Sequence, residues 1–432
     1  MNKLSSLLKS LLAANLSVKD FLHIVFGGIY VNGFNIVQIH QQRYVKKLHK
    51  RGDKIKVVFI ASNLSLWKYE RVYRLMSKDE RFCVTILLSP IITIDKQAQL
   101  NDIRQLREYF LLKNIPFIDF KETELPFDLR RLDPDIIFYP QPYTVLLNKE
   151  HNSTSFYDKL LCYAPYGFWD TSGEWSYNRK FHNVAWKLFY ATLINKNDAI
   201  RIAKNKGRNV VVSGYLGTDD FLEEKELLYR EKSQQKRIIW APHFSIGGDD
   251  ELVHFSTFLD IADFMQNIAQ KYTTIQWIFK PHPWLLSELY AHRDWGKERA
   301  DAYYDFWRNV PNGQLQTGEY VDLFMTSDAM IHDCGSFTIE YLYTQNPVMY
   351  LTKDIEYVKS TKNQLGKESL YCHYIGQSKD DIISFVDNIV CNGKDTMKNR
   401  RKEFFDKYLY LPAGKTVARN IYEDLVKSLK LD

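Results

Sequence analysis

The chain has few cysteines, and none of them form a C-x-x-C pair. Five cysteines are scattered over 432 residues, a pattern that indicates neither a disulfide framework nor a zinc knuckle. We therefore expect a reducing, cytoplasmic compartment, no metal site and no cofactor. The motifs G-x-x-x-x-G-K-[ST], G-x-S-x-G and H-E-x-x-H are also missing, which weakens kinase, hydrolase and zinc-protease interpretations.

Long apolar runs are missing as well. No uncharged stretch contains the roughly 18 apolar residues that are needed to cross a bilayer. The N-terminal leucines are interrupted by Lys9, Lys19 and Asp20, and no small-residue cleavage site follows them, which argues against a signal peptide. The chain is otherwise of ordinary globular composition, with 45% hydrophobic and 25% charged residues. Its length predicts two or three domains of roughly 100–200 residues each.

The net charge of +6 is concentrated at one end of the chain. Residues 1–56 contain ten Lys or Arg and two Asp, a net +8. No nucleic-acid-binding motif accompanies this charge, so nucleic acid is not an expected partner. Apolar residues recur at helical spacing within 7–26, and the basic cluster 43–51 follows them. This pattern predicts an interfacial helix with a polybasic patch, peripheral at the inner face of the plasma membrane.

A second interpretation of this basic end stays open. Hydrophobic periodicity cannot name what a helix packs against. The same residues therefore also fit a helix that packs on the protein's own body and leaves a solvated basic turn.

From residue 54 onward, short buried runs alternate with helix-length segments, and a charged stretch at 223–236 separates two such series. This alternation predicts an α/β fold of two doubly wound, Rossmann-like domains, with a ligand cleft at the carboxyl ends of their strands. The expected parts are a basic amphipathic helical segment at 1–53, a first domain at 54–222, a second domain at 236–416 and a C-terminal helix at 417–432 that crosses back.

The individual elements are expected at the following positions. Strands are predicted at 56–62, 84–88, 116–118, 135–139, 160–163, 209–213, 237–242, 275–280, 329–332 and 348–351. Helices are predicted at 67–77, 100–113, 252–272, 336–343 and 417–429.

The sharpest local motif is Lys280-Pro281-His282-Pro283, directly after a predicted strand. The two prolines fix the backbone and aim His282 out of the strand's carboxyl end, where it can donate a hydrogen bond to a phosphate. His282 is thus a candidate catalytic and phosphate-binding residue, with Lys280 beside it. The alternative is a surface turn in which His282 packs between prolines.

A second motif runs from Asp333 to Glu340. Gly335 permits a tight turn, Ser336 is placed to cap the next helix, and the amides of that helix start suit a pyrophosphate. Glu340, one turn further on, is placed to accept hydrogen bonds from a ribose. The alternatives are ordinary helix capping by Asp333 and Ser336 and a solvated Glu340.

Two further strand ends carry candidate residues. His243 follows the strand 237–242 and is a candidate for binding phosphate or polarising a leaving group, unless it only binds local backbone. In the first domain, Tyr166 and Gly167 follow the strand 160–163 on the expected acceptor side. Asp170 is a candidate catalytic base on chemical grounds.

The order of these motifs resembles the CDP-glycerol glycerophosphotransferase family of teichoic-acid and capsule synthesis. The matching motifs are Ala241-Pro242, Lys280-Pro281-His282-Pro283, Asp333-Cys334-Gly335-Ser336, Asn346-Pro347 and Ala413-Gly414-Lys415. The resemblance implies a GT-B architecture, with the acceptor bound by the first domain and the nucleotide by the second. It further implies that His282, Asp333 and Ser336 hold the pyrophosphate of the donor.

The resemblance also suggests the reaction. A metal-independent transferase would move glycerol phosphate, or a similar polyol phosphate, from a CDP-activated donor to a saccharide or lipid-linked acceptor. The products would belong to bacterial capsule, teichoic acid or lipopolysaccharide.

The chain departs from the family pattern at three positions. Tyr166-Gly167 stands where the family has His-Gly, whose His is the expected acceptor base, and Gly335 stands where the family favours Ser. Glu340 replaces an Asp and resembles the ribose-binding Glu of GT-B glycosyltransferases. A nucleotide-sugar donor therefore stays open as an alternative. So does an inactive GT-B scaffold that binds a polysaccharide or a partner enzyme.

Overall fold

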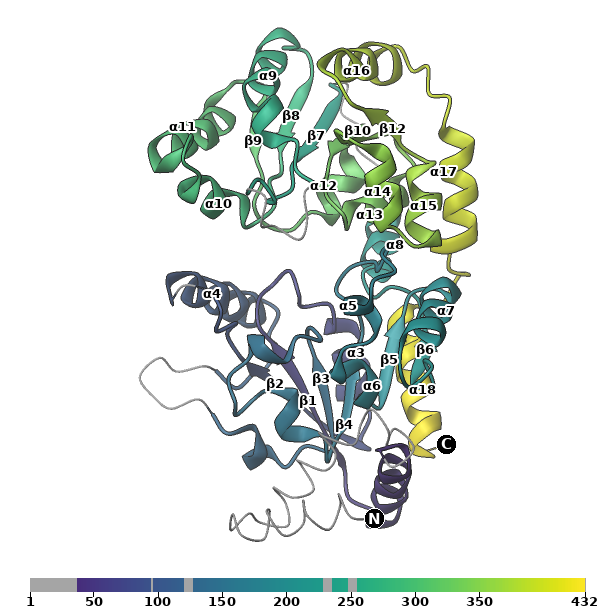
Figure 1. The fold of residues 1–432 in the computed structure, drawn as a ribbon. Coiled ribbons are helices and arrows are strands. Elements are labelled where there is room, and N and C mark those ends of the chain that lie inside the picture. The colour runs from purple at the N-terminus through teal and green to yellow at the C-terminus, as the bar shows by residue number, and fades with distance from the viewer. Residues whose placement is uncertain (1–36, 95, 120–126, 228–234, 248–254, 432) are drawn as a thin grey trace, which may run out of the picture. The chain divides into compact units, whose positions relative to one another are not determined.

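The computed structural model describes residues 37–94, 96–119, 127–227, 235–247 and 255–431 (Figure 1). The apolar repeat at 7–26 lies outside these residues. The chain forms two compact units: unit 1 is Met1–Tyr166, Gly173–Gly217 and Gly414–Asp432, and unit 2 is Gly167–Ser172 and Thr218–Ala413. The division at Gly217–Thr218 falls just ahead of the charged stretch in which the sequence analysis placed it.

Unit 1 is built on a parallel sheet in the order β2-β1-β3-β4-β5-β6. The strands are β1 (Ile55–Ala61), β2 (Phe82–Leu88), β3 (Ile136–Tyr139), β4 (Leu160–Tyr163), β5 (Lys187–Tyr190) and β6 (Val210–Val212). All residues of β3 and β4 are buried, as expected for strands of a parallel sheet covered on both faces. Helices α3 (Glu70–Ser77), α4 (Lys96–Leu112) and α7 (Leu193–Ile202) link the strands (Figure 1).

Two expectations for unit 1 need correction. The predicted strand 116–118 is reduced to a single bridge between Ile118 and Leu87, because Pro116 has no N–H with which to extend the pairing. The strand β5 was not predicted, since it is a four-residue run that begins with a charged residue, Lys187.

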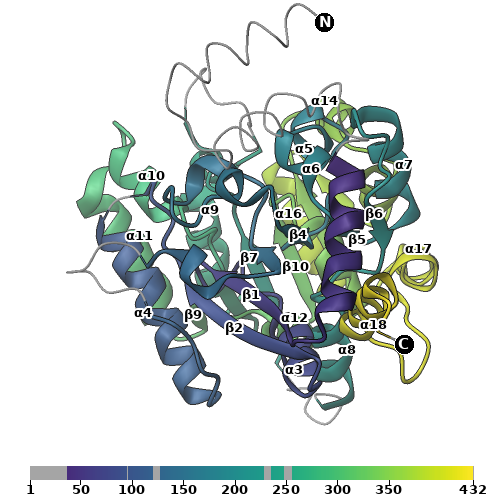
Figure 2. The same ribbon diagram turned by 90° about the horizontal axis from the view of Figure 1, so that it is seen from below.

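The described part of the basic end is a helix over residues 37–51 that packs on unit 1 (Figure 2). Its stripe of Val37, Gln41, Val45 and Leu48 is buried, and Gln41 Nε2 donates to the carbonyl oxygen of Val184 over 2.9 Å. For these residues, packing on the protein's own body is the correct interpretation. The opposite face of the helix is exposed and basic, and consists of Arg43, Lys46, Lys47 and Lys50.

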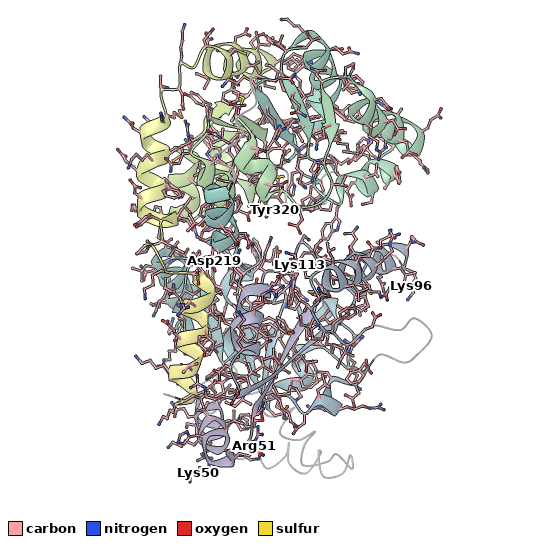
Figure 3. All side chains as sticks on the ribbon, turned by 180° about the vertical axis from the view of Figure 1, so that it is seen from behind. Lys50, Arg51, Lys96, Lys113, Asp219 and Tyr320 are labelled. Carbon is pink, nitrogen blue, oxygen red and sulfur yellow. The ribbon has the colours of Figure 1, made fainter. Side chains whose placement is uncertain are left out.

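Specific contacts attach both the helix 37–51 and the C-terminal helix of the chain to the rest of unit 1. Arg51, seen beside Lys50 at the end of the helix in Figure 3, pairs with the buried carboxylate of Asp135 at 2.6 Å. At the other end of the chain, α18 (Val417–Leu429) also packs on unit 1. Gly214, at φ +97°, allows this packing, because a Cβ there would lie 2.6 Å from Val417 Cγ2.

Unit 2 contains a second parallel sheet in the order β12-β11-β10-β7-β8-β9. The strands are β7 (Arg237–Ala241), β8 (Gln276–Phe279), β9 (Gly313–Leu315), β10 (Ala329–His332), β11 (Val348–Leu351) and β12 (Tyr374–Gly376). The direction of winding reverses between the neighbours β7 and β10. In doubly wound sheets, ligands bind outside the carboxyl ends of the strands at such a switch point.

The helices of unit 2 explain much of the aromatic content. The stretch 284–310 forms α10 (Leu285–Ala291) and α11 (Gly296–Asn309). Their aromatic side chains pack with Trp240, Trp277 and Phe279 in one buried cluster. Helix α9 (Phe258–Lys271) begins later than the predicted 252. Residues 255–257 instead hydrogen-bond to Ser245, His243 and Asp333.

Candidate functional site

The switch point of unit 2 brings together motifs that lie far apart in sequence. Ala241, the last residue of β7, pairs with His332, the last residue of β10. The loops that begin with Pro242 and with Asp333 therefore start side by side. On the other flank of β7, the Lys280 amide donates to the Trp240 carbonyl at 2.8 Å and the His282 amide to the Pro242 carbonyl at 3.0 Å, so the K-P-H-P turn joins the same edge.

The Asp333 side chain connects the loops at this edge of the sheet. Its carboxylate accepts hydrogen bonds from the amide of His243 at 2.6 Å, the amide of Thr257 at 2.6 Å and the hydroxyl of Thr257 at 2.9 Å. The side chain is buried, and burial raises its pKa to about 6. Through these bonds Asp333 holds the His243 loop and the residues just before α9 in place.

His243 and His282 form a pair with their ring centroids 5.2 Å apart. Nδ1 of His243 accepts from the Ser245 amide, and Nδ1 of His282 accepts from the Trp284 amide, each over 3.2 Å. A ring nitrogen that accepts an N–H carries no proton, so we assign the proton of each neutral ring to Nε2, and the Ser245 hydroxyl, 2.9 Å from Nδ1 of His243, then donates to that nitrogen.

The environment keeps both rings neutral. Burial is the main cause that lowers the pKa of His243 to about 4 and that of His282 to about 3, and nearby lysine charge adds to it. Around pH 7 the pair therefore presents two Nε2–H donors without positive charge. Such fixed donors suit the oxygens of a phosphate and stabilise charge that develops on them.

Unit 2 also contains a buried carboxylate, that of Glu340. Glu340 ends helix α13 (Phe337–Glu340), and its Oε2 accepts a hydrogen bond of 2.6 Å from the hydroxyl of Tyr320. The Lys280 ammonium lies 5.7 Å from the centroid of the Tyr320 ring. Tyr320, labelled in Figure 3, directly precedes α12 (Val321–Thr326). Sequence reasoning missed Tyr320, because no motif surrounds it.

The turn between Asp333 and Glu340 differs from its prediction. The expected helix 336–343 is a four-residue α13 followed by the 3-10 helix η5 (Tyr341–Thr344). Ser336 is exposed, and its hydroxyl caps no amide. On the Cβ side of Gly335 there is no atom within 4 Å. The turn thus offers an uncommitted hydroxyl and an open backbone, while a helix of one turn contributes little dipole.

Asp170 is not available as a free base. Its carboxylate forms a buried ion pair with Lys362, 192 residues further along the chain. The Lys362 side chain is 1% exposed and that of Asp170 is 8% exposed. This carboxylate is committed to compensating a buried ammonium, which would have no counter-charge without it.

The two residues predicted on the acceptor side fall in different units. Tyr166 is in unit 1, where its carbonyl accepts from the Tyr215 hydroxyl at 3.0 Å. Burial raises the pKa of the Tyr166 phenol well above its ordinary value, so the phenol stays protonated near pH 7. Gly167 is in unit 2, where a Cβ would lie 3.7 Å from Ser336 Cβ and 3.8 Å from Glu340 Oε1.

Neither a metal cluster nor a membrane span emerges from the parts of the chain that the structure describes. Within them, no group of three or more His, Cys, Asp or Glu side chains is arranged to hold a metal ion. In the same residues, no helix combines the length and the apolar character needed to cross a bilayer.

Two parallel, doubly wound sheets, each the centre of its own unit, define a protein of the GT-B fold. The sequence matches the CDP-Glycerol:Poly(glycerophosphate) glycerophosphotransferase family over residues 206–427. This match spans half of the chain, and the protein belongs to that family of transferases. The prediction of the family and of the fold is thereby confirmed.

Solved structures agree with this fold. The wall teichoic acid polymerase TagF is similar at 13% identity with a TM-score of 0.59, over 96% of this chain and 99% of the other. A UDP-GlcNAc 2-epimerase from Neisseria meningitidis bound to UDP-GlcNAc has 14% identity and a TM-score of 0.55, over 88% and 100%. A putative epimerase of the same kind from Listeria monocytogenes has 13% identity and a TM-score of 0.57, over 88% and 97%. No curated protein matches the sequence significantly.

Proposed function

We propose that this protein moves glycerol phosphate, or a similar polyol phosphate, from a CDP-activated donor to a saccharide or lipid-linked acceptor during synthesis of a bacterial cell-surface polymer. The observation that carries the proposal is the pair of neutral histidines, His243 and His282, at the switch point of unit 2. Their fixed Nε2–H donors suit a pyrophosphate, and family membership over residues 206–427 supports the CDP-linked donor.

The chemistry follows from the charges at this site. The oxygen of an acceptor hydroxyl attacks the phosphorus of the transferred group, the bond to the bridging oxygen breaks, CMP leaves with the electron pair, and the hydroxyl proton passes to the leaving phosphate or to solvent. Negative charge grows on the leaving phosphate, so hydrogen bonds from His243, His282 and the Ser336 hydroxyl strengthen in the transition state. We propose that Glu340, whose Oε2 accepts from the Tyr320 hydroxyl, accepts hydrogen bonds from the ribose hydroxyls. We propose that the reaction needs no metal ion.

The buried carboxylate of Glu340 also favours a second candidate function. A Glu at a ribose site is equally suited to a nucleotide sugar, which would make the protein a glycosyltransferase. The two functions differ in the nucleotide that leaves: CMP from CDP-glycerol, and UDP or GDP from a nucleotide sugar.

The deciding experiment offers purified protein CDP-glycerol, UDP-sugars and GDP-sugars in turn, with an oligosaccharide or lipid-linked acceptor. Release of CMP that depends on the acceptor is the expected result. Release of UDP or GDP instead would replace the polyol phosphate donor by a nucleotide sugar. If no nucleotide binds in titration calorimetry, the protein is an inactive scaffold and the proposal is wrong.

We further propose that the protein acts at an anionic membrane surface on the cytoplasmic side, where a lipid-linked acceptor would be found. The exposed face of the helix 37–51 supports this location, because Arg43, Lys46, Lys47 and Lys50 all point away from the buried stripe. Each basic residue near such a surface contributes about 1 kcal/mol, and salt weakens the attraction.

A further inference from the structure

The short segment Gly167–Ser172 leaves unit 1, runs along unit 2 and returns. Its backbone is fixed to one place in unit 2. Thr171 forms an antiparallel bridge with Lys362, and the amide of Asn363 donates to the Asp170 carbonyl at 2.8 Å. Asn363 Nδ2 also donates to the Trp169 carbonyl at 3.0 Å.

The helix that follows is shaped to receive this segment. Asn363 caps α15 (Gln364–Leu370) through Oδ1, which accepts from the Gly366 amide at 3.0 Å. A Cβ on Gly366 would lie 2.5 Å from the Asp170 carbonyl oxygen, closer than real Cβ contacts come. Glycine is therefore required at 366 for the two backbones to approach.

A buried ion pair completes the attachment. The Lys362 ammonium and the Asp170 carboxylate are almost fully enclosed, so each charge depends on the other for compensation. A loop held only for packing does not need such a pair, since apolar side chains of similar size would serve equally well. The pair does fix the segment in one register, because any slip would leave both charges buried and unpaired.

The other end of the segment lies at the candidate nucleotide site. The Cβ side of Gly167 faces Ser336 and Glu340 at 3.7 and 3.8 Å. Phe168 packs beside Tyr343, with ring centroids 6.4 Å apart. At these distances a methyl group on Gly167 would make ordinary van der Waals contact with the Ser336 turn and with the Glu340 carboxylate.

We propose that the segment Gly167–Ser172 forms a wall of the donor site, with Gly167 as a specificity-determining residue and the Asp170–Lys362 pair as positioning residues that hold it there. This inference rests on the proposed function, because it assumes that a nucleotide occupies the site at Ser336 and Glu340. It moves Gly167 from the acceptor side, where sequence placed it, to the donor side. It also gives Asp170 a positioning role in place of that of a base.

The first test adds a methyl group between Gly167 and the side chains of Ser336 and Glu340. Gly167→Ala adds a methyl group at ordinary contact distance, so the melting temperature should stay the same. The Kd for CDP, measured by titration calorimetry, should rise at least tenfold. Gly318→Ala is the matched control, since Gly318 is exposed in the same unit and a Cβ there meets nothing within 4 Å. An unchanged Kd for Gly167→Ala, with tight binding by the wild type, would overturn the inference alone.

The second test removes the Asp170–Lys362 ion pair without leaving either charge buried alone. The double variant Asp170→Asn/Lys362→Met should fold, bind CDP about tenfold more weakly and raise the donor KM while leaving the acceptor KM unchanged. Lys362→Arg retains the pair and should bind as the wild type does. The control Glu356→Gln/Lys359→Met removes an exposed pair in the helix before Lys362.

The outcomes separate this inference from the proposed function. A double variant with wild-type affinity and donor KM would overturn the positioning role. If the wild type binds neither CDP, UDP nor GDP, the proposed function and this inference fail together.

Discussion

The two units carry different chemistry at the same edge of the same kind of sheet. In unit 1, the four residues that follow each of the six strands include no Asp, Glu, Lys, Arg or His. Ten of these 24 positions carry a hydroxyl or amide side chain, as in Ser62, Ser89 and Tyr166, and the other fourteen are apolar residues, Pro or Gly. In unit 2, the corresponding positions include Lys280, His282, His243 and Asp333.

This difference supports the proposal that unit 2 binds the donor and unit 1 the acceptor. Doubly wound sheets bind ligands at the carboxyl ends of their strands, so the side chains there select the ligand. Hydroxyl and amide groups suit a neutral polyol or saccharide, whereas paired histidines and a lysine suit phosphates. Within four residues of the strand ends of unit 1 there is thus no carboxylate, histidine or lysine that could act as a base. In the proposed reaction, most of the catalysis then comes from unit 2 and its stabilisation of the leaving group.

The largest expected effect comes from removing a phosphate-facing donor of unit 2. His282→Ala should lower kcat on the order of 100-fold, because a fixed donor to developing charge is lost. His292→Gln is the matched control, since His292 Nδ1 accepts from the amide two residues ahead, as His282 Nδ1 does, but at the end of α10. Steady-state CMP release measures both variants. Equal activity of His282→Ala and the wild type would show that the charged edge of unit 2 is not the reaction site.

A smaller effect is expected from the support of Glu340. Tyr320→Phe removes the 2.6 Å hydrogen bond to Glu340 Oε2. A hydrogen bond to a charged group is worth about 1.5–3 kcal/mol, so the donor KM should rise at least tenfold with kcat little changed. Tyr272→Phe is the control, because its hydroxyl donates to the Asp387 carboxylate over 2.9 Å elsewhere in unit 2. A donor KM that is the same in both variants would contradict a ribose role for Glu340.

The sequence predicted the parts of the fold with strong local patterns. Strands such as β1, β3 and β7 are runs of apolar residues bounded by polar or Pro residues, and their periodicity predicts them directly. Strands β9 and β12 are three residues long, and sheet neighbours stabilise them rather than local preference, so no local pattern marks them.

The residues of the candidate site, like the strands, were predictable where a local pattern marks them. His243, His282 and the Asp333–Glu340 turn follow strands, so topology alone brings them to one edge. The roles of Asp333 and Asp170 depend on partners far away in the chain, Thr257 and Lys362. Only the folded structure shows that one carboxylate holds a loop and that the other is already paired.

The charge of unit 1 lies on the helix 37–51 instead of on its strand ends, and this contrast can be tested at a membrane. Lys46→Glu/Lys47→Glu should lower binding to vesicles of mixed neutral and anionic lipid at least about 30-fold at low salt, because about 1 kcal/mol is lost for each of the two basic residues. Lys394→Glu/Lys398→Glu, exposed in unit 2, serves as the control in co-sedimentation. Equal loss in both variants would indicate a general charge effect and no membrane-facing helix.

The smallest expected effect concerns stability, and it tests whether the histidines of unit 2 are neutral in the folded protein. The folded pKa of His282 is about 3 and that of His243 about 4, both below the ordinary 6.5. Between about pH 6.5 and 4 the unfolded chain therefore binds more protons, and the free energy of unfolding falls as the pH falls. Asp333 acts in the opposite sense, because its folded pKa of about 6 lies above the ordinary 3.8.

Because His282 and Asp333 change the free energy of unfolding in opposite directions as the pH falls, substituting them should have opposite effects on the melting temperature. His282→Gln removes one contribution that destabilises the folded protein as the pH falls. Between pH 7 and 5 the melting temperature of this variant should therefore fall by about 2–6 °C less than that of the wild type. This difference corresponds to about 1–2 kcal/mol in the free energy of unfolding. Asp333→Asn removes the compensating contribution, so its melting temperature should fall further than that of the wild type. Scanning calorimetry at the two pH values measures all three proteins. Parallel pH profiles for the wild type and His282→Gln would mean that His282 is charged or solvated in the folded state, and the neutral donor pair on which the leaving-group argument depends would then be wrong.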